Sequence, residues 1–280
     1  MGREENIQVF EDTQQKCRSD SRLIQAIAQA NAAQRLILES DSETWKPACR
    51  YMRPAQVIVS RKRTLEAASA YIGKKVCVLN FASATNPGGG VTRGSSAQEE
   101  AICRCSSLYF NLREKRMWEG FYAPHRAQKN PLHNDDCIYT PGVVVFKSDT
   151  AAPQALPPDE WYTVNVLTCA APNLRERPGN RMNDGGGVRS VQIGKQELRQ
   201  LHEKRMRRIL SIAASEGNEV MILGAFGCGA FSNPPDIVAE AMKTVVQEYR
   251  SFFEAVEFAV YCPPRDDSNY RVFERVLGRI

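Results

Sequence analysis

The stretch that decides the fold is NFASATNPGGGVTRGSSAQEEAICRC, residues 80–105. An apolar run at residues 76–79 precedes it and predicts a strand, whereas the apolar positions after Ser96 have helical spacing. Three adjacent glycines are costly in backbone entropy, and they are favoured where the chain must adopt φ > 0 or approach a ligand closely. We therefore expect a strand, a loop and a helix, with the loop N–H groups available to anions and sugar hydroxyls.

Two adjacent glutamates, Glu99 and Glu100, open the predicted helix. One interpretation is structural, because Ser96-x-x-Glu99 matches a capping box in which the two side chains satisfy backbone N–H groups. The other is functional, because two carboxylates beside an anion-binding loop are unfavourable unless they take part in chemistry. Both interpretations stay open for Glu99 at this point.

The spacing of these groups resembles a known signature. Poly(ADP-ribose) glycohydrolases carry GGG, six to eight residues and then QEE, and here seven residues separate Gly90 from Gln98. Residues 80–90 are similar to the bacterial-type branch, a macrodomain superfamily fold. The resemblance covers roughly residues 55–278, and the N-terminal part and the lengths of two variable loops depart from it.

A second glycine-rich loop, LGAFGCGAF at residues 223–231, also follows a buried-type strand and precedes a helix. Ligands of open α/β sheets bind beyond the carboxyl ends of strands, so two such loops on neighbouring strands could hold two parts of one ligand. The sequence lacks Gly-Lys-Ser/Thr, which disfavours a nucleotide-hydrolysing P-loop. The loop resembles the diphosphate-binding loop of the same family.

The resemblance implies that the ribose–ribose O-glycosidic bond of poly(ADP-ribose) is cleaved and that ADP-ribose is released. By position, Glu100 matches the catalytic glutamate, Glu99 the glutamate that holds ribose hydroxyls, and Asn86 the asparagine that reaches the terminal ribose. The other substrate-binding residues that it implies are Gly88, Gly89, Gly90, Val91, Gln98, Gly227, Cys228, Gly229, Ala230 and Phe231. Apart from this implied role, Cys228 is expected to be a small buried residue that fills space. Phe226 and Phe231 are expected to anchor the loop as core residues, and the resemblance implies that Phe231 also packs against a ligand ribose or base.

The chemistry needs a carboxylic acid that protonates the leaving oxygen and then activates water. Adjacent helical residues diverge by about 100°, which disfavours an opposed carboxylate pair and favours one acid/base with one positioning group. The helix N-terminus stabilises a carboxylate by about 0.3–1 kcal/mol, whereas burial shifts reach about 3–5 pKa units. We therefore expect Glu100 to be protonated in the complex.

The remaining strands and helices alternate, which predicts a macrodomain-like α/β fold with a mixed, mainly parallel sheet between helices. We expect a helical N-terminal extension at 1–50, packed on the core or serving as a partner-binding arm, and a catalytic domain at 51–280. Residues 5–45 are predicted helical. Residues 111–135 are predicted to be irregular, with His125 and His133 facing solvent; the alternative is a role of either as a ligand or a base. Arg205 is expected either in a buried ion pair or with its stem reaching to solvent, and residues 175–188 are expected to form a mobile surface loop.

The chain has 280 residues, 42% of them hydrophobic, a formal charge of +5 and nine cysteines without a Cys-x-x-Cys pair. This composition predicts a globular monomer in a reducing cytoplasm, or in the nucleus if the source is eukaryotic, with no cofactor, metal site, membrane segment or direct nucleic-acid binding.

The partners that the resemblance implies are poly(ADP-ribose), ADP-ribose and ADP-ribosylated proteins. Two rival functions are a non-catalytic ADP-ribose reader, which has no need of QEE, and a mono-ADP-ribosyl hydrolase.

Overall fold

The computed structural model describes residues 2–41, 47–179 and 189–280. Within these residues, seven strands form one sheet in the order β1-β4-β5-β3-β6-β7-β2. The strands are β1 (Arg35–Ile37), β2 (Gln56–Ser60), β3 (Val76–Phe81), β4 (Cys137–Val145), β5 (Tyr162–Cys169), β6 (Val220–Leu223) and β7 (Ala255–Ala259). The five strands from β5 to β2 are mutually parallel, whereas β4 is antiparallel to β1 and β5. The predicted mixed, mainly parallel sheet is confirmed.

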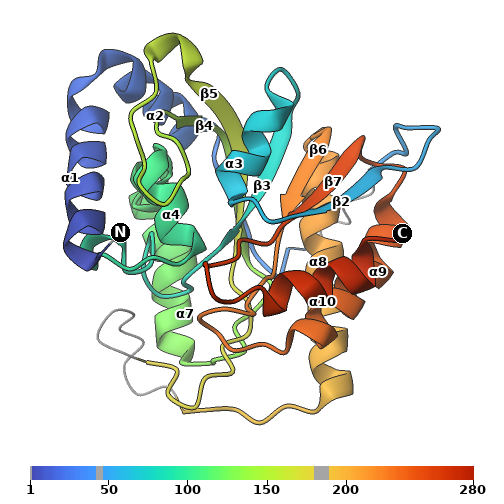
Figure 1. The fold of residues 1–280 in the computed structure, drawn as a ribbon. Coiled ribbons are helices and arrows are strands. Elements are labelled where there is room, and N and C mark those ends of the chain that lie inside the picture. The colour runs from blue at the N-terminus through green and yellow to red at the C-terminus, as the bar shows by residue number, and fades with distance from the viewer. Residues whose placement is uncertain (1, 42–46, 180–188) are drawn as a thin grey trace.

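Helices cover both faces of the sheet (Figure 1). The α-helices are α1 (Arg3–Ser19), α2 (Ser21–Ala33), α3 (Thr64–Ala68), α4 (Gln98–Cys105), α5 (Leu108–Leu112), α6 (Lys115–Met117), α7 (Ala123–Gln128), α8 (Lys195–Ser215), α9 (Pro235–Tyr249) and α10 (Ser268–Leu277). Short 3₁₀ turns are η1 (Ser69–Tyr71), η2 (Val91–Arg93) and η4 (Pro158–Glu160), and η3 (Trp118–Tyr122) is a π-helical turn.

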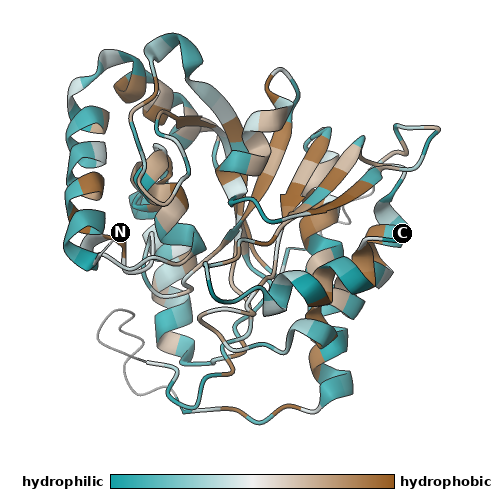
Figure 2. Cartoon of the chain, in the orientation of Figure 1, coloured by the Kyte–Doolittle hydropathy of each residue, from teal (hydrophilic) through white to brown (hydrophobic). Residues whose placement is uncertain are grey.

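The apolar core consists of two main clusters, one on each face of the sheet. Alternation along β3 sends Cys77 and Leu79 to the cluster under α8, α9 and α10, and Val76 and Val78 to the cluster under α3, α4 and α5. Figure 2 shows the result as hydrophobic strands beneath helices whose outer faces are hydrophilic. A strand that is apolar on both faces belongs in the middle of a covered sheet, and β3 lies there.

The N-terminal part differs from the predicted continuous helix. A break at Asp20, whose carboxylate accepts from the Arg22 N–H (2.9 Å), separates α1 from α2. The prediction of helix for Leu36 and Ile37 was wrong, because these residues form β1 and pair with β4 at the edge of the sheet. An open sheet edge offers a ladder of backbone partners that overrides the weak helical pattern. The predicted boundary at residue 50, between an N-terminal extension and a catalytic domain, stays a prediction.

The segment at residues 111–135 was wrongly predicted to be irregular. It contains the end of α5, then α6, η3 and α7. Met117, Phe121 and His125 recur at a spacing of four and are all buried, so they form the inward stripe of a nearly continuous helical segment. The histidine and the neighbouring polar residues concealed this stripe, because only two of its three positions are apolar.

Several smaller predictions can be compared with the structure. The buried ion pair of Arg205 is confirmed, since its Nε donates to Asp135 at 2.8 Å and both side chains are almost fully buried. Of the predicted surface loop at residues 175–188, residues 180–188, which include the second glycine triplet, lie outside the described residues. In the described parts of the chain, no helix is both long and apolar enough to span a membrane.

Candidate active site

A cavity of about 570 Å³ opens where the two glycine-rich loops meet. It lies beyond the carboxyl ends of β3 and β6, which are direct neighbours in the sheet. The strand order confirms that the two loops follow neighbouring strands, and that they hold two parts of one ligand stays a prediction. Among the predicted site residues, those that line the cavity are Gly89, Gly90, Gln98, Glu99, Glu100, Gly227, Gly229, Ala230 and Phe231.

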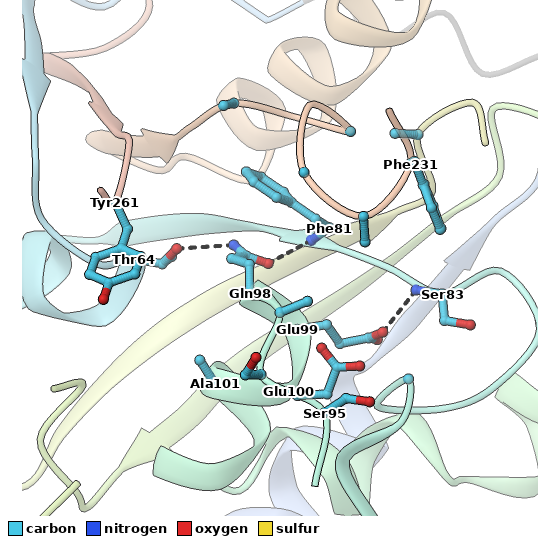
Figure 3. Close-up of a pocket in the computed structure, with 18 of the residues that line it drawn as sticks. Thr64, Phe81, Ser83, Ser95, Gln98, Glu99, Glu100, Ala101, Phe231 and Tyr261 are labelled. Carbon is cyan, nitrogen blue, oxygen red and sulfur yellow. Dashed lines mark hydrogen bonds between the residues drawn. The ribbon is translucent and has the colours of Figure 1, made fainter. Parts of the chain in front are cut away.

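The two glutamates lie at the floor of this cavity, at the start of α4 (Figure 3). One Glu99 oxygen accepts from the Ser83 N–H at 2.8 Å, and the other accepts from Asn80 Nδ2 at 3.2 Å. Glu100 accepts from the Gly90 N–H at 2.9 Å. Both side chains are buried, with 2% of Glu99 and 7% of Glu100 exposed.

The capping-box interpretation of Glu99 is wrong. The helix begins at Gln98 with Ala97 at its N-cap, and the cap makes no side-chain hydrogen bond. Glu99 turns inward and satisfies the N–H of Ser83 beyond the end of β3 instead. Its position therefore depends on the sheet, so a local sequence pattern could not reveal it.

The two carboxyl groups converge although their backbone positions diverge around the helix. A Cβ added at Gly89 would lie 2.5 Å from Glu100 Oε1 and 3.1 Å from Glu99 Oε2. Both side chains thus reach the same point of the first loop, where the backbone has φ of +59° at Gly89. Glycine is required at this position both for its conformation and for the space that the carboxyl groups occupy.

Burial is the main cause that raises the pKa of both glutamates. It raises the pKa of Glu99 to about 8, with a further contribution from the negative charge of Glu100. Burial also raises the pKa of Glu100, and the Gly90 N–H opposes this rise. The pair therefore retains a proton at neutral pH, as a general acid requires.

Gln98 fixes the start of α4 to its surroundings. Its Oε1 accepts from the Phe81 N–H at 2.9 Å, and its Nε2 donates to Leu79 O at 2.7 Å and to Thr64 Oγ1 at 3.0 Å. These bonds join α4 to β3 and α3, as Figure 3 shows in part. The predicted role of Gln98 in substrate binding stays a prediction.

The second loop is organised by Asn233. Its Nδ2 donates to Pro172 O (2.7 Å) and Gly227 O (3.0 Å), and its Oδ1 contacts His202 Nε2 at 2.9 Å. A Cβ at Gly227, where φ is +80°, would lie 2.6 Å from this amide. Sequence analysis did not identify Asn233, although an asparagine that ends a glycine-rich turn is a recognisable signal.

The N–H groups of Gly229, Ala230 and Phe231 have no hydrogen-bond partner among the described residues. They belong to the part of the loop that lines the cavity. Unpaired N–H groups grouped in a turn form a site for phosphate oxygens. Phe226 is fully buried and packs on Phe81 with ring centroids 5.5 Å apart. Phe231 lines the cavity and also packs against the core, and its contact with a ligand stays a prediction.

Four predicted site residues lie outside the cavity lining. Val91 is fully buried, Cys228 packs against the core as a half-buried filler, and Gly88 lies against the ring of Tyr109. Asn86 is half-exposed and is held by Arg126. Their roles in substrate binding stay predictions.

The prediction that both loop histidines face solvent is wrong. His125 is buried in α7, and its Nδ1 lies 2.7 Å from Phe121 O. His133 Nδ1 lies 2.8 Å from Ala171 O, and burial lowers the pKa of His133 to about 3. His133 is therefore neutral, and its ring packs 5.9 Å from that of Phe231, behind the second loop.

Further lining residues come from elements that sequence analysis did not connect with the site. They are Arg63 and Thr64 at the start of α3, Tyr261 after β7, Asn269 in α10, Asp149 and Arg175. Several directly follow parallel strands, so the rule that ligands bind at the carboxyl ends of strands was the available signal.

Comparison with known proteins agrees with this arrangement of fold and site. The family described as "Microbial-type PARG, catalytic domain" matches residues 4–148. The chain belongs to this family of microbial-type poly(ADP-ribose) glycohydrolases, which confirms the resemblance. A search of curated proteins gave no significant match.

Solved structures extend the similarity over almost the whole chain. The poly(ADP-ribose) glycohydrolase of Thermomonospora curvata is 30% identical with a TM-score of 0.83, covering 98% of this chain and 100% of its own. The same enzyme bound to the inhibitor ADP-HPD has a TM-score of 0.79 at 30% identity, covering 98% and 99%. The Deinococcus radiodurans enzyme in complex with ADP-ribose is 30% identical with a TM-score of 0.75, covering 90% of this chain and 96% of its own.

Proposed function

We propose that Glu100 is the general acid and base with which this glycohydrolase cleaves the ribose–ribose O-glycosidic bonds of poly(ADP-ribose). The observation that carries the proposal is the convergence of Glu100 on the first glycine loop. Its carboxyl group accepts from the Gly90 N–H at 2.9 Å and lies beside Gly89 in a cavity of suitable size for ADP-ribose.

The protonated Glu100 donates its proton to the bridging oxygen as the bond from this oxygen to the anomeric carbon breaks. Positive charge then develops on the anomeric carbon, beside a carboxyl group that has become negative. The Glu100 carboxylate next accepts a proton from a water molecule, whose oxygen bonds to the anomeric carbon. The products are ADP-ribose and a shortened chain, and Glu100 is protonated again.

Glu99 is the proposed positioning group for the ribose hydroxyls. Its oxygens are held by the Ser83 N–H and by Asn80, so the carboxyl group has a defined direction. The second loop is the proposed diphosphate site, because the N–H groups of Gly229, Ala230 and Phe231 are available along the cavity wall. ADP-ribosylated proteins are the proposed carriers of the polymer.

The test is the variant Glu100→Gln, with Glu240→Gln on the exposed face of α9 as its matched control. Loss of the acid should lower kcat on labelled poly(ADP-ribose) by about 10²–10⁴-fold. Binding of ADP-ribose, measured by calorimetry, should stay within a few-fold of wild type. Near-normal release of ADP-ribose by Glu100→Gln would overturn the assignment.

The same assay addresses activity on single ADP-ribose groups. A peptide that carries mono-ADP-ribose, incubated in parallel with the polymer, reports whether the site also opens the linkage to protein. We expect release from the polymer to be much faster, because the proposed proton donor faces a ribose–ribose bond.

A further inference from the structure

The start of α1 lies against the end of the first glycine-rich loop. Arg3 Nε donates to Arg93 O at 2.8 Å, and Asn6 Nδ2 donates to Gly94 O at 3.1 Å. Two consecutive carbonyl groups of the loop thus accept from side chains of one helix. Arg3 is exposed, whereas Asn6 is only 4% exposed, so loss of Asn6 would leave a buried carbonyl group without this donor.

The backbone of Gly94 also depends on this helix. Its φ is +76°, and an added Cβ would lie 2.3 Å from Arg3 O. The helix therefore approaches so closely that only glycine fits between helix and loop. The loop cannot move toward α1, and the hydrogen bond from Asn6 prevents it from moving away.

A tight turn transmits this position to the proposed acid. Gly90 O accepts from the Arg93 N–H at 2.9 Å and from the Ser95 N–H at 3.2 Å, which are the residues on either side of Gly94. The N–H of Gly90 donates to Glu100 at 2.9 Å. The placement of this N–H therefore depends on the turn, and the turn depends on α1.

The helix that carries the proposed acid is tied to α1 as well, and the two helices are in contact (Figure 1). Thr13 Oγ1 donates to Arg104 O near the end of α4 at 2.5 Å, and Arg104 Nη1 donates to Ser95 O at 2.5 Å. The loop that offers the Gly90 N–H and the helix that carries its acceptor thus share one support. Asn6 is the buried side chain through which this support reaches the loop.

We propose that Asn6 is a positioning residue that places the Gly90 N–H against the carboxyl group of Glu100. This inference rests on the proposed function, in which Glu100 is the general acid and base. The Gly90 N–H stabilises the Glu100 carboxylate and so opposes the rise in its pKa that burial causes. Loss of Asn6 should therefore displace the acid and raise its pKa further.

The charged groups around Glu100 stay the same when Asn6 is replaced by alanine. Glu99 lies beside it, and Arg104 lies one turn further along α4. The Cys103 thiol stays neutral, because burial raises its pKa well above the ordinary value. Residues 80–92 and 224–231, which form most of the two loops, carry no charged side chain. The other charged residues that line the cavity are Arg63, Asp149 and Arg175.

The first measurement is the pH dependence of the single-turnover rate of Asn6→Ala on labelled poly(ADP-ribose). The rate at neutral pH should fall about 10-fold, because the acid is displaced. The descending limb, where the acid loses its proton, should move to higher pH by about one unit, because a hydrogen bond to a charged group is lost. A limb at the wild-type pH, or one moved to lower pH, would overturn the proposal.

Binding of ADP-ribose to the same variant separates positioning from general loosening of the site. The second loop makes no contact with Asn6, so the Kd measured by calorimetry should stay within about threefold of wild type. A loss of affinity as large as the loss of rate would mean that the whole site has loosened, which would contradict the proposal.

The matched control is Gln8→Ala, at an exposed amide of the same helix. This variant should keep the wild-type rate, pH profile and affinity. An equal shift of the descending limb in Gln8→Ala would show that any change in α1 acts on the site, and the assignment to Asn6 would fail.

Arg3→Ala gives a second test, and it decides the proposal if Asn6→Ala does not fold. Arg3 is exposed, so its removal leaves the core intact. At about 300 mM salt, which screens the lost charge, the descending limb should still move to higher pH, by less than in Asn6→Ala. An unchanged limb in this variant would contradict transmission of the position from α1 through the turn.

The pKa of Glu100 can also be measured without catalysis, by a carbon-13 NMR titration in which Glu100→Gln identifies the carboxyl resonance. If wild type releases no ADP-ribose from polymer, the proposed function fails, and this titration still decides the role of Asn6. If wild type cleaves the polymer and the pKa of Glu100 is the same in Asn6→Ala, the inference fails while the proposed function stands.

Discussion

The first glycine-rich loop is held by side chains from distant parts of the chain, whereas the second is held mainly by its own asparagine. Arg3 Nε donates to Arg93 O at 2.8 Å, and Asn6 Nδ2 donates to Gly94 O at 3.1 Å, both from α1. A Cβ at Gly94 would lie 2.3 Å from Arg3 O, so α1 is in direct contact with the end of this loop.

The contact with α1 continues to the glycine triplet itself. Phe10 meets Tyr109 edge to face with ring centroids 4.8 Å apart, and the Tyr109 ring would lie 2.7 Å from a Cβ at Gly88. Thr13, fully buried in α1, donates to the backbone oxygen of Arg104 at the end of α4. The N-terminal helix therefore braces both the loop and the helix that carries the glutamates.

The second loop has a simpler support. Its backbone turns are closed by local bonds, such as Cys228 N to Ala225 O at 3.0 Å and Asn233 N to Gly227 O at 3.0 Å. The two glycine-rich loops therefore differ in how they are supported. The loop beside the proposed proton donor is fixed from several directions, whereas the loop that offers N–H groups is closed mainly by its own turn.

The largest expected effect is that of Gly89→Ala on catalysis. The new Cβ would lie 2.5 Å from Glu100 Oε1, and the flexible carboxyl end is the group that moves. A displacement of about 1 Å at a catalytic group costs about 10²-fold in rate. We expect kcat/KM on the polymer to fall by at least that factor, with the protein still folded by circular dichroism.

Gly229→Ala in the second loop is the matched control for Gly89→Ala. No atom lies within 4 Å of the Cβ that it would add, and the backbone is not in the left-handed region. Its kcat/KM should stay within about threefold of wild type. Equal losses in the two variants would mean that the loops are equally sensitive and would break the comparison.

The second expected effect concerns Asn233→Ala, which removes the support of the second loop. Buried carbonyl groups of Pro172 and Gly227 would lose their donor, and His202 would lose its partner. The free energy of unfolding in urea should fall by about 2–3 kcal/mol, and ADP-ribose affinity should fall with it. Gln196→Ala, at an exposed amide in α8, is the control and should change neither quantity. An Asn233→Ala protein of normal stability would contradict the assignment.

The last expected effect is a change in the pH dependence of stability. Burial raises the pKa of Glu99 from 4.5 to about 8 in the folded protein. Between these values the folded state keeps a proton that the unfolded state has lost, so stability falls as pH rises, by at most about 1.4 kcal/mol per pH unit from this group. Glu99→Gln cannot ionise and should make the dependence flatter between pH 5 and 8.

Urea unfolding at several pH values measures this difference, with Glu240→Gln as a surface control that should keep the wild-type dependence. Asn233→Ala should also keep it, because the support of the second loop is an uncharged amide. Parallel curves for Glu99→Gln and wild type would show that the buried pair carries no retained proton, which would also weaken the proposed acid role of Glu100.

Much of the site could be predicted from short windows of sequence. The strand at β3, the glycine triplet, the glutamate pair and the second loop were each identified, because strand and helix periodicity and glycine conformation are local properties. The family resemblance followed from the GGG and QEE motifs, the seven residues between them and the residues around the two loops. Glu99 was the exception, since a local pattern offered a helix cap as one interpretation of a side chain that turns inward.

The sequence by itself determined that two glycine loops follow apolar strands and that two carboxyl groups open a helix behind the first. Only the tertiary structure decided that β3 and β6 are neighbours, that α1 braces the loop and that Arg126 reaches Asn86. Asn6 and Gly94 are 88 positions apart, and Arg126 and Asn86 are 40 apart. Such contacts depend on which surfaces remain to be filled once the whole chain has packed, and no local pattern encodes that choice.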